Sequence, residues 1–145
     1  MGATENQLGI LSESLDQKIR VLDCIRSCNE RQAEAFSGRE ADLEAFDREF
    51  DEKDRLIDEI TRLDEGFEVL YDGVAQELQD HRTQYAAQIK ELQEKIAKVT
   101  ELSVSIQAQE ARNKKLVEDY FAKTRNGIRQ NRQSSRAAYD YYKSM

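Results

Sequence analysis

The side chains that could do chemistry in this sequence are few and widely separated. There is one histidine, His81, and there are two cysteines, Cys24 and Cys28, four residues apart. A catalytic site needs a nucleophile or a perturbed acid or base held in a pocket, and neither cysteine has an obvious activating neighbour. A zinc site would need further ligands near the cysteines, whereas His81 lies far along the chain. We therefore expect no metal site, and we interpret the cysteines as small buried hydrophobic side chains on one helix face.

The glycines and the carboxylates also lack the spacing that catalysis or cofactor binding requires. The six glycines are scattered, and none belongs to a phosphate-binding loop. Adjacent acids such as Asp51 and Glu52 point in different directions on a helix. The inward-facing Glu-x-x-His motif of di-metal helical bundles does not occur. The sequence therefore predicts a protein that is not an enzyme and that needs no cofactor.

The composition indicates helices with narrow apolar stripes and wide polar faces. Hydrophobic residues make up 39% of the 145 residues, charged residues make up 35%, and there is no proline. A compact globule of this length would carry more apolar side chains. No apolar run is long enough to span a membrane, and the first residues lack the basic and apolar regions of a signal peptide. We expect a cytoplasmic protein without membrane insertion, and the net charge of −7 argues against nucleic-acid binding.

Apolar residues recur at helical spacing along most of the chain. In the first segment the steps of three and four residues predict a helix over about residues 4–37, with the stripe Leu8, Leu11, Leu15, Ile19, Leu22 and Ile25. Asp42 is a suitable N-cap for the next helix. Further stripes predict helices over about 42–75 and 83–125, with a reversal between Asp72 and Thr83 and with Gly66 as a kink. Lys53 and Asp64 occupy the remaining positions of the second stripe, and Asn113 lies on the buried stripe of the third segment, where a polar residue can fix the register of packed helices.

The predicted fold is therefore all-α, an elongated antiparallel helical hairpin or three-helix bundle with coiled-coil packing over residues 1–125. Charge is unevenly spread along it: residues 39–80 carry sixteen acids and five bases, a net of −11. We interpret this acidic stretch as a solvated helix face. Residues 126–145 are expected to form a basic tail that is partly mobile or conditionally helical, and residues 123–145 carry six bases and one acid, a net of +5. The tail either docks on a partner or folds its tyrosines back onto the bundle.

Two segments resemble flagellar export chaperones of the FlgN type. Residues 52–67, EKDRLIDEITRLDEGF, resemble the second helix of that family. Residues 105–117, SIQAQEARNKKLV, resemble the helix that carries its asparagine-centred, leucine-flanked segment. The similarity spans nearly the whole chain, and FliT-type chaperones are similar as well. The resemblance implies a cytosolic chaperone that binds the C-terminal helix of a hook–filament junction protein or another late export substrate. It also implies that the chaperone prevents premature assembly and delivers the substrate to the export gate.

A partner helix would lie in a groove between helices of the bundle. The candidate partner-binding residues are the apolar positions of the last helix, its central asparagine and the tyrosines of the tail: Leu102, Ile106, Asn113, Leu116, Val117, Tyr120, Phe121, Tyr139, Tyr141 and Tyr142. Exposure of Val117 and Phe121 would favour this partner site. A homodimer is compatible with the same pattern. The alternative function is a structural coiled-coil scaffold that self-associates and has no chaperone role.

Overall fold

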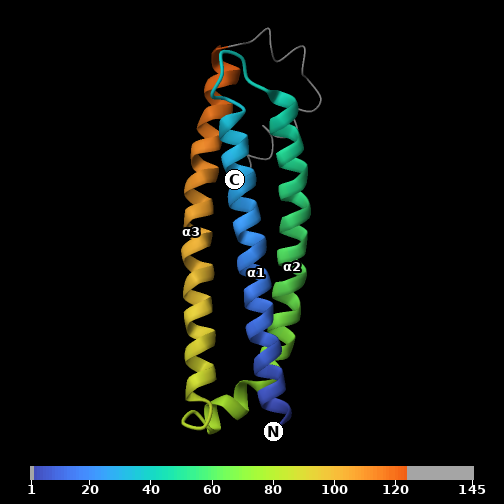
Figure 1. The fold of residues 1–145 in the computed structure, drawn as a ribbon, viewed down its shortest axis with the longest axis vertical. Helices are drawn as coiled ribbons and strands as arrows, with labels where there is room; N and C mark the ends of the chain where they lie inside the picture. Colours follow the sequence, from blue (N-terminus) through green and yellow to red (C-terminus); the bar gives the residue numbers. More distant parts are fainter. Residues whose placement is uncertain (1, 124–145) are drawn as a thin grey trace. The chain divides into compact units, whose positions relative to one another are not determined.

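The computed structural model describes residues 2–123, which form three α-helices and contain no strand. The helices are α1 (Ala3–Glu34), α2 (Leu43–Asp80) and α3 (Ala86–Lys123), coloured along the sequence in Figure 1. The predicted all-α fold is therefore confirmed. Residues 124–145, which include Tyr139, Tyr141 and Tyr142, lie outside the described part of the chain.

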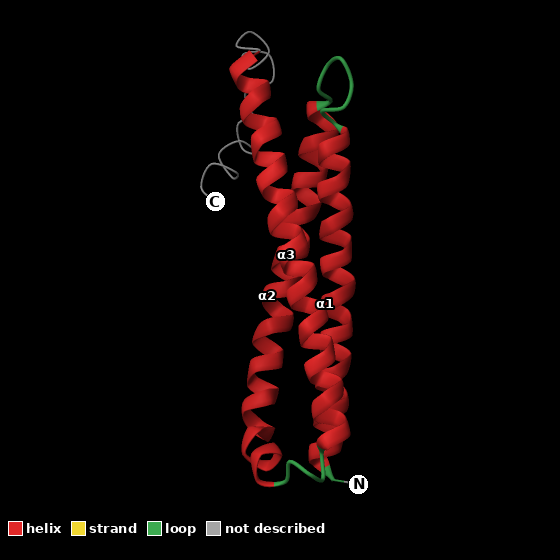
Figure 2. Ribbon diagram, turned by 90° about the vertical axis from the view of Figure 1, so that its left-hand side faces the viewer, coloured by secondary structure: helices red, strands yellow, loops and turns green. Residues whose placement is uncertain are grey.

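Two short connections join the helices (Figure 2). In the connection over residues 35–42, Asp42 acts as the predicted N-cap of α2, because its Oδ1 accepts a hydrogen bond of 3.0 Å from the backbone N–H of Ala45. At the end of α1, the Ser37 hydroxyl donates a hydrogen bond of 2.7 Å to the carbonyl of Glu34. The backbone N–H of Ser37 donates to the same carbonyl at 3.0 Å, so this serine satisfies one of the carbonyl groups left without a partner at the helix end.

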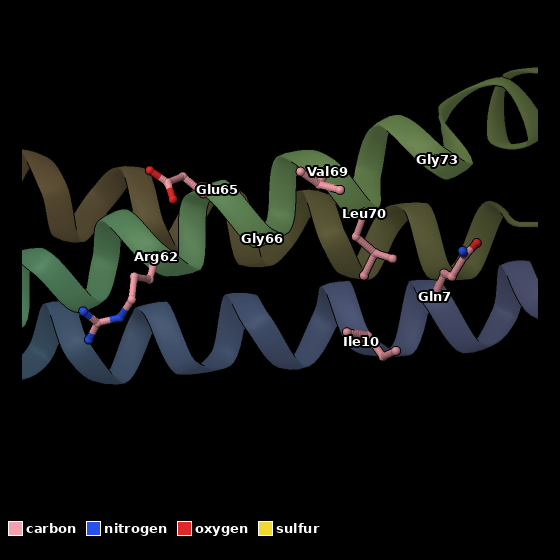
Figure 3. Close-up of a pocket in the computed structure, with 8 residues that line it drawn as sticks. All are labelled: Gln7, Ile10, Arg62, Glu65, Gly66, Val69, Leu70 and Gly73. Carbon is pink, nitrogen blue, oxygen red and sulfur yellow. The ribbon is translucent and has the colours of Figure 1, made fainter.

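The turn between α2 and α3 lies further along the chain than the predicted ends of these helices indicated. α2 continues to Asp80 instead of ending near residue 75, and α3 begins at Ala86 instead of near residue 83. Gly66 and Gly73 both lie inside α2. A glycine inside a helix costs about 1 kcal/mol relative to alanine, which is too little to end a helix whose following residues are good helix formers. The ribbon of α2 instead changes direction just past Gly73, as Figure 3 shows.

The chain divides into two compact units, and each is described by itself. Unit 1 comprises residues 1–23 and 57–103, so it contains the first part of α1, the second part of α2 and the first part of α3. Within it, α2 and α3 run antiparallel on either side of the turn. The buried core of this unit is formed by side chains from these three helix segments and from the turn: Leu8, Leu11, Leu15, Val74, Leu78, Tyr85 and Leu92.

Unit 2 comprises residues 24–56 together with the chain from 104 onward. Its apolar core contains Ala35, Phe46 and Val117. The ring of Phe36 packs edge-on against Phe46 and Tyr120, with centroids 5.4 Å and 5.8 Å apart. Aromatic pairs favour this edge-to-face arrangement, so the rings join the connection after α1 to α2 and α3.

The two cysteines in unit 2 differ in their surroundings. Cys28 is buried, as predicted, and burial raises the pKa of its thiol. Cys24 is exposed, so the prediction that it is buried was wrong. Residues four apart on a helix differ by about 40° in direction, and here that rotation is enough to bring Cys24 to the surface.

Candidate partner-binding surface

Three of the seven described members of the predicted site on α3 are buried. Asn113 and Val117 are 0% and 2% exposed, and Leu102 is also buried. The other described members of the predicted set are only partly exposed: Ile106, Leu116, Tyr120 and Phe121. Val117 belongs to the core of unit 2, and Phe121 packs against that core. Val117 thus lacks the exposure that would favour a partner site, Phe121 has it only in part, and partner binding at the set as a whole stays a prediction.

Asn113 belongs to a buried polar cluster of unit 2. Its side-chain Nδ2 donates a hydrogen bond of 3.0 Å to the backbone carbonyl of Asn29. The ammonium of Lys53 donates to Asn29 Oδ1 at 2.9 Å and to Glu110 Oε1 at 2.7 Å. The cluster thus connects α1, α2 and α3, and its geometry is compatible only with one alignment of these helices. This agrees with the register-fixing role predicted for Asn113.

The Lys53–Glu110 ion pair is sealed from water and is not a reactive centre. The Lys53 side chain is 1% exposed. Burial lowers the pKa of its ammonium, and the negative charge of Glu110 opposes that shift. The second carboxylate oxygen of Glu110 is buried without a hydrogen-bond partner. A lysine enclosed in this way has no path to a substrate, so we assign the pair to helix alignment rather than catalysis. The described residues contain no cluster of three or more His, Cys, Asp or Glu that could hold a metal.

Exposed large apolar side chains gather in unit 1. Four of the five in the described residues belong to it: Ile10 at 54%, Val69 at 75%, Tyr71 at 43% and Ile96 at 46% exposed. The fifth, Val104, lies in unit 2. Single exposed apolar residues are normal on protein surfaces, whereas contiguous ones mark interaction sites. Two grooves of unit 1 collect these four residues.

The first groove, called here the aromatic groove, lies between the second part of α2 and the first part of α3. It encloses about 710 Å³. The rings of Phe67 and Tyr71 are parallel in its wall, with centroids 6.2 Å apart. Across from them, Ile89, Leu92 and Ile96 of α3 complete the apolar lining.

Among the described residues, the lining of the aromatic groove contains cationic side chains and no carboxylate. Arg82 and Lys90 line it, with Gln79 and Gln93 as the remaining polar residues. Neither cation makes an ion pair with another described residue. Lys95, one turn further along α3, is by contrast bound to Asp16 at 3.0 Å and to Glu91 at 3.3 Å. Arg82 lies in the turn that closes the antiparallel helix pair. The positive charge is therefore at the turn end of the groove, and the aromatic rings are at its opposite end.

The second groove, called here the glycine groove, lies between α1 and α2 (Figure 3). Leu70 of α2 points toward Ile10 of α1 across it, and Gln7 and Val69 also line it. The same stretch of α2 also contributes a pair of charged residues and two glycines: Arg62, Glu65, Gly66 and Gly73. At either glycine an added Cβ atom would meet nothing within 4 Å. The backbone of α2 is therefore open to close approach from outside at two points seven residues apart.

A signal for the aromatic groove was present in the sequence. Ile96, Val99 and Leu102 follow one another in steps of three, which departs from the alternation of a continuous stripe. Residues six apart lie about 120° apart around a helix, so Ile96 and Leu102 cannot both face the same core. The structure buries Leu102 and leaves Ile96 46% exposed. No comparable feature of the sequence indicated that Tyr71 would be exposed, because Tyr71 fits the apolar stripe of α2.

Comparison with known proteins gives no relative: no protein-family model, no curated protein and no solved structure matches the chain. The FlgN-type resemblance therefore remains a prediction from the sequence. Within the described residues, no helix is long and apolar enough to cross a membrane.

Proposed function

We propose that this protein is a cytoplasmic chaperone of the flagellar export type, which binds an amphipathic helix of a late export substrate and prevents its premature assembly. The observation that supports helix binding most directly is the aromatic groove. It presents Tyr71 and Ile96 to solvent on a chain in which 35% of the residues are charged. The flagellar substrate class and delivery to the export gate come from the sequence resemblance.

The chemistry of the groove fits one face of a helix. A guest helix with apolar residues at i, i+3 or i+4, and i+7 would place them against Phe67, Tyr71 and Ile96. Apolar burial contributes about 25 cal/mol per Å², and the loss of translational and rotational freedom offsets several kcal/mol of that gain. A groove of this size therefore supports reversible binding. A chaperone needs reversible binding in order to release its guest.

The cations of the aromatic groove, which make no ion pair with another described residue, set a preference for the charge of the guest. Arg82 and Lys90 can pair with carboxylates beside the apolar face of a guest helix. Because the cations lie toward the turn, the acidic end of the guest would lie beside residues 81–85. The proposed site thus differs from the set predicted on the last helix, since it uses the first part of α3 instead of its end.

Site-specific photo-crosslinking in the native host tests this proposal. A photoreactive phenylalanine analogue replaces Tyr71 in the aromatic groove and, as a matched control, Val104, which is 60% exposed and lies outside both grooves. We expect position 71 to crosslink to a helical segment of a secreted flagellar protein, identified by mass spectrometry, and position 104 to give no such adduct. A groove adduct with a protein unrelated to secretion would refute the flagellar assignment.

Paired substitutions separate the chaperone from the scaffold alternative. Tyr71 and Ile96 are 43% and 46% exposed, so Tyr71→Ser with Ile96→Ser should lower the melting temperature by a few degrees, whereas affinity for the identified guest helix should fall at least about tenfold. Val104→Ser should leave both properties unchanged. If the wild-type chain binds no guest and instead self-associates through the groove, light scattering will show oligomers that the double variant lacks. That result would favour the scaffold.

A further inference from the structure

The acids nearest to the cations of the aromatic groove are engaged elsewhere. Arg82 lies in the turn, and Lys90 lies about one helical turn after the start of α3. Glu77 accepts a hydrogen bond of 3.4 Å from the hydroxyl of Tyr85. Asp80 accepts one of 2.9 Å from a side-chain amide of α2. Among the described residues, neither acid pairs with the two cations, and neither lines the groove.

The ends of α2 and α3 add little net charge at this turn. α2 ends and α3 begins there, so the partial negative charge of one helix end lies beside the partial positive charge of the other. α2 has no base in its last turn and α3 has no acid in its first turn, so neither partial charge is offset by a side chain of its own helix. The two helix ends oppose each other, and the full charges of Arg82 and Lys90 remain.

A guest helix presents opposite partial charges at its two ends. Its last four carbonyl groups and its first four N–H groups have no partner within the helix. The carbonyl end carries partial negative charge, and the N–H end carries partial positive charge. Arg82 and Lys90 offer hydrogen-bond donors only. They can therefore bind the free carbonyls of a guest helix, whereas they can accept nothing from its free N–H groups.

We propose that Arg82 and Lys90 determine the direction of the guest helix, which lies in the aromatic groove with its carbonyl end toward the turn. The guest then runs parallel to α2 and antiparallel to α3. The inference rests on the proposed function, because it supposes that a helix fills this groove. It adds that the two cations are specificity-determining residues, and that the acidic end of the guest is its C-terminal end.

The reverse direction is disfavoured by the same two side chains. It would bring the free N–H groups of the guest toward Arg82 and Lys90, and acids in the first turn of the guest would then have to offset the repulsion. At the opposite end, the described residues of the lining include no charged side chain that could favour either direction. Discrimination between the two directions therefore comes from the turn end of the groove.

Paramagnetic NMR of the full-length chain with one synthetic peptide tests the direction. The peptide forms an amphipathic helix with leucine at i, i+4 and i+7, neutral polar residues elsewhere, an acetylated N-terminus and a free α-carboxylate. We expect a nitroxide on its last residue to broaden the amide resonances of residues 79–86 more than that of Ile96, and a nitroxide on its first residue to do the reverse. The opposite pattern would overturn the proposed direction and would leave helix binding by the groove intact.

Calorimetric titration tests the role of the two cations. Replacing the α-carboxylate of the peptide by a carboxamide should weaken binding to the wild-type chain at least about threefold. The same replacement should have no effect on binding to Arg82→Gln with Lys90→Gln. Damage to the groove alone would weaken both peptides equally, so the comparison reports on the charge at the end of the peptide. Equal affinity of the two peptides for the wild-type chain would overturn the assignment.

The matched control carries Arg20→Gln with Arg62→Gln. Both arginines are exposed, belong to the same unit, make no ion pair with another described residue and lie outside the lining of the aromatic groove. The change in net charge is the same, and the control should keep the preference for the α-carboxylate. Loss of that preference in the control would show that overall charge causes it. Absence of binding by either peptide would refute helix binding by the groove and this inference with it.

Discussion

Lys53 holds a position of α2 that the apolar stripe would ordinarily fill, and its energetics follow from that placement. A buried ion pair gives up hydration that its Coulomb attraction only partly restores. Removing one partner is more damaging than removing both, because the remaining charge stays buried without compensation. Lys53 and Glu110, whose side chains are 1% and 8% exposed, meet this condition.

Substitution of Lys53 should therefore be strongly destabilising, and a second substitution should reverse the loss. We expect Lys53→Met to lower the free energy of unfolding by about 3–5 kcal/mol, and Lys53→Met with Glu110→Leu to bring it back to the wild-type value or above. Chemical denaturation followed by circular dichroism measures both. A double variant that is less stable than Lys53→Met would show that the buried Glu110 charge is not the cause of the loss.

The sequence located Lys53 but not its partner. It was identified by its place in the stripe, whereas the partner carboxylate is 57 residues away and on another helix. Asp64 occupies an equivalent stripe position and instead pairs at the surface with Lys18 at 2.6 Å. Periodicity assigns a residue to a face of its helix. Which face is covered, and by which side chain, depends on the neighbouring helix.

At the scale of the element, α2 contains glycines that its own packing does not require. At Gly66 a Cβ atom has open space, and the same holds for Gly9 in α1. Neither glycine has a positive φ angle. Alanine at such a position narrows the unfolded ensemble and fits the helix without strain.

We therefore expect Gly66→Ala and Gly9→Ala each to raise the free energy of unfolding by about 0.5–1 kcal/mol. Thermal unfolding of the single variants and of the double variant provides the measurement, and the effects should add because the sites share no partner. Destabilisation by Gly66→Ala alone would show that α2 needs conformational freedom at this point, as the predicted kink at Gly66 supposed.

The helices themselves could be predicted from the sequence, whereas not all of their ends could. Asp42 was identified as an N-cap because its side chain can satisfy a backbone N–H locally, and the structure contains that bond. The end of α2 has no such local determinant. Gly73 weakens the helix without ending it, and the turn is held by Tyr85, which is 5% exposed and belongs to the core of unit 1. That contact joins residues from three helix segments and has no signature in the chain near the turn.

At the scale of the whole molecule, apolar burial is unevenly distributed along a single helix. Over residues 66–73 of α2 no side chain is buried, and only Phe67 and Leu70 are half-buried. Over residues 46–56 of the same helix, Phe46, Lys53 and Leu56 are all at most 4% exposed. Segments with few buried contacts open locally at lower free energy than well-packed ones. The stretch that separates the two grooves is therefore the part of α2 best able to adjust to a guest.

Native-state hydrogen exchange should reveal this gradient within α2. We expect amides of residues 66–73 to be at least about tenfold less protected than those of residues 46–56, although both stretches are helical. The difference should shrink when a guest helix fills the aromatic groove, because the guest buries Phe67 and Tyr71 and stabilises the closed form. Equal protection across both stretches of the free chain would mean that α2 opens only as a whole, and binding would then have to proceed without local adjustment of this helix.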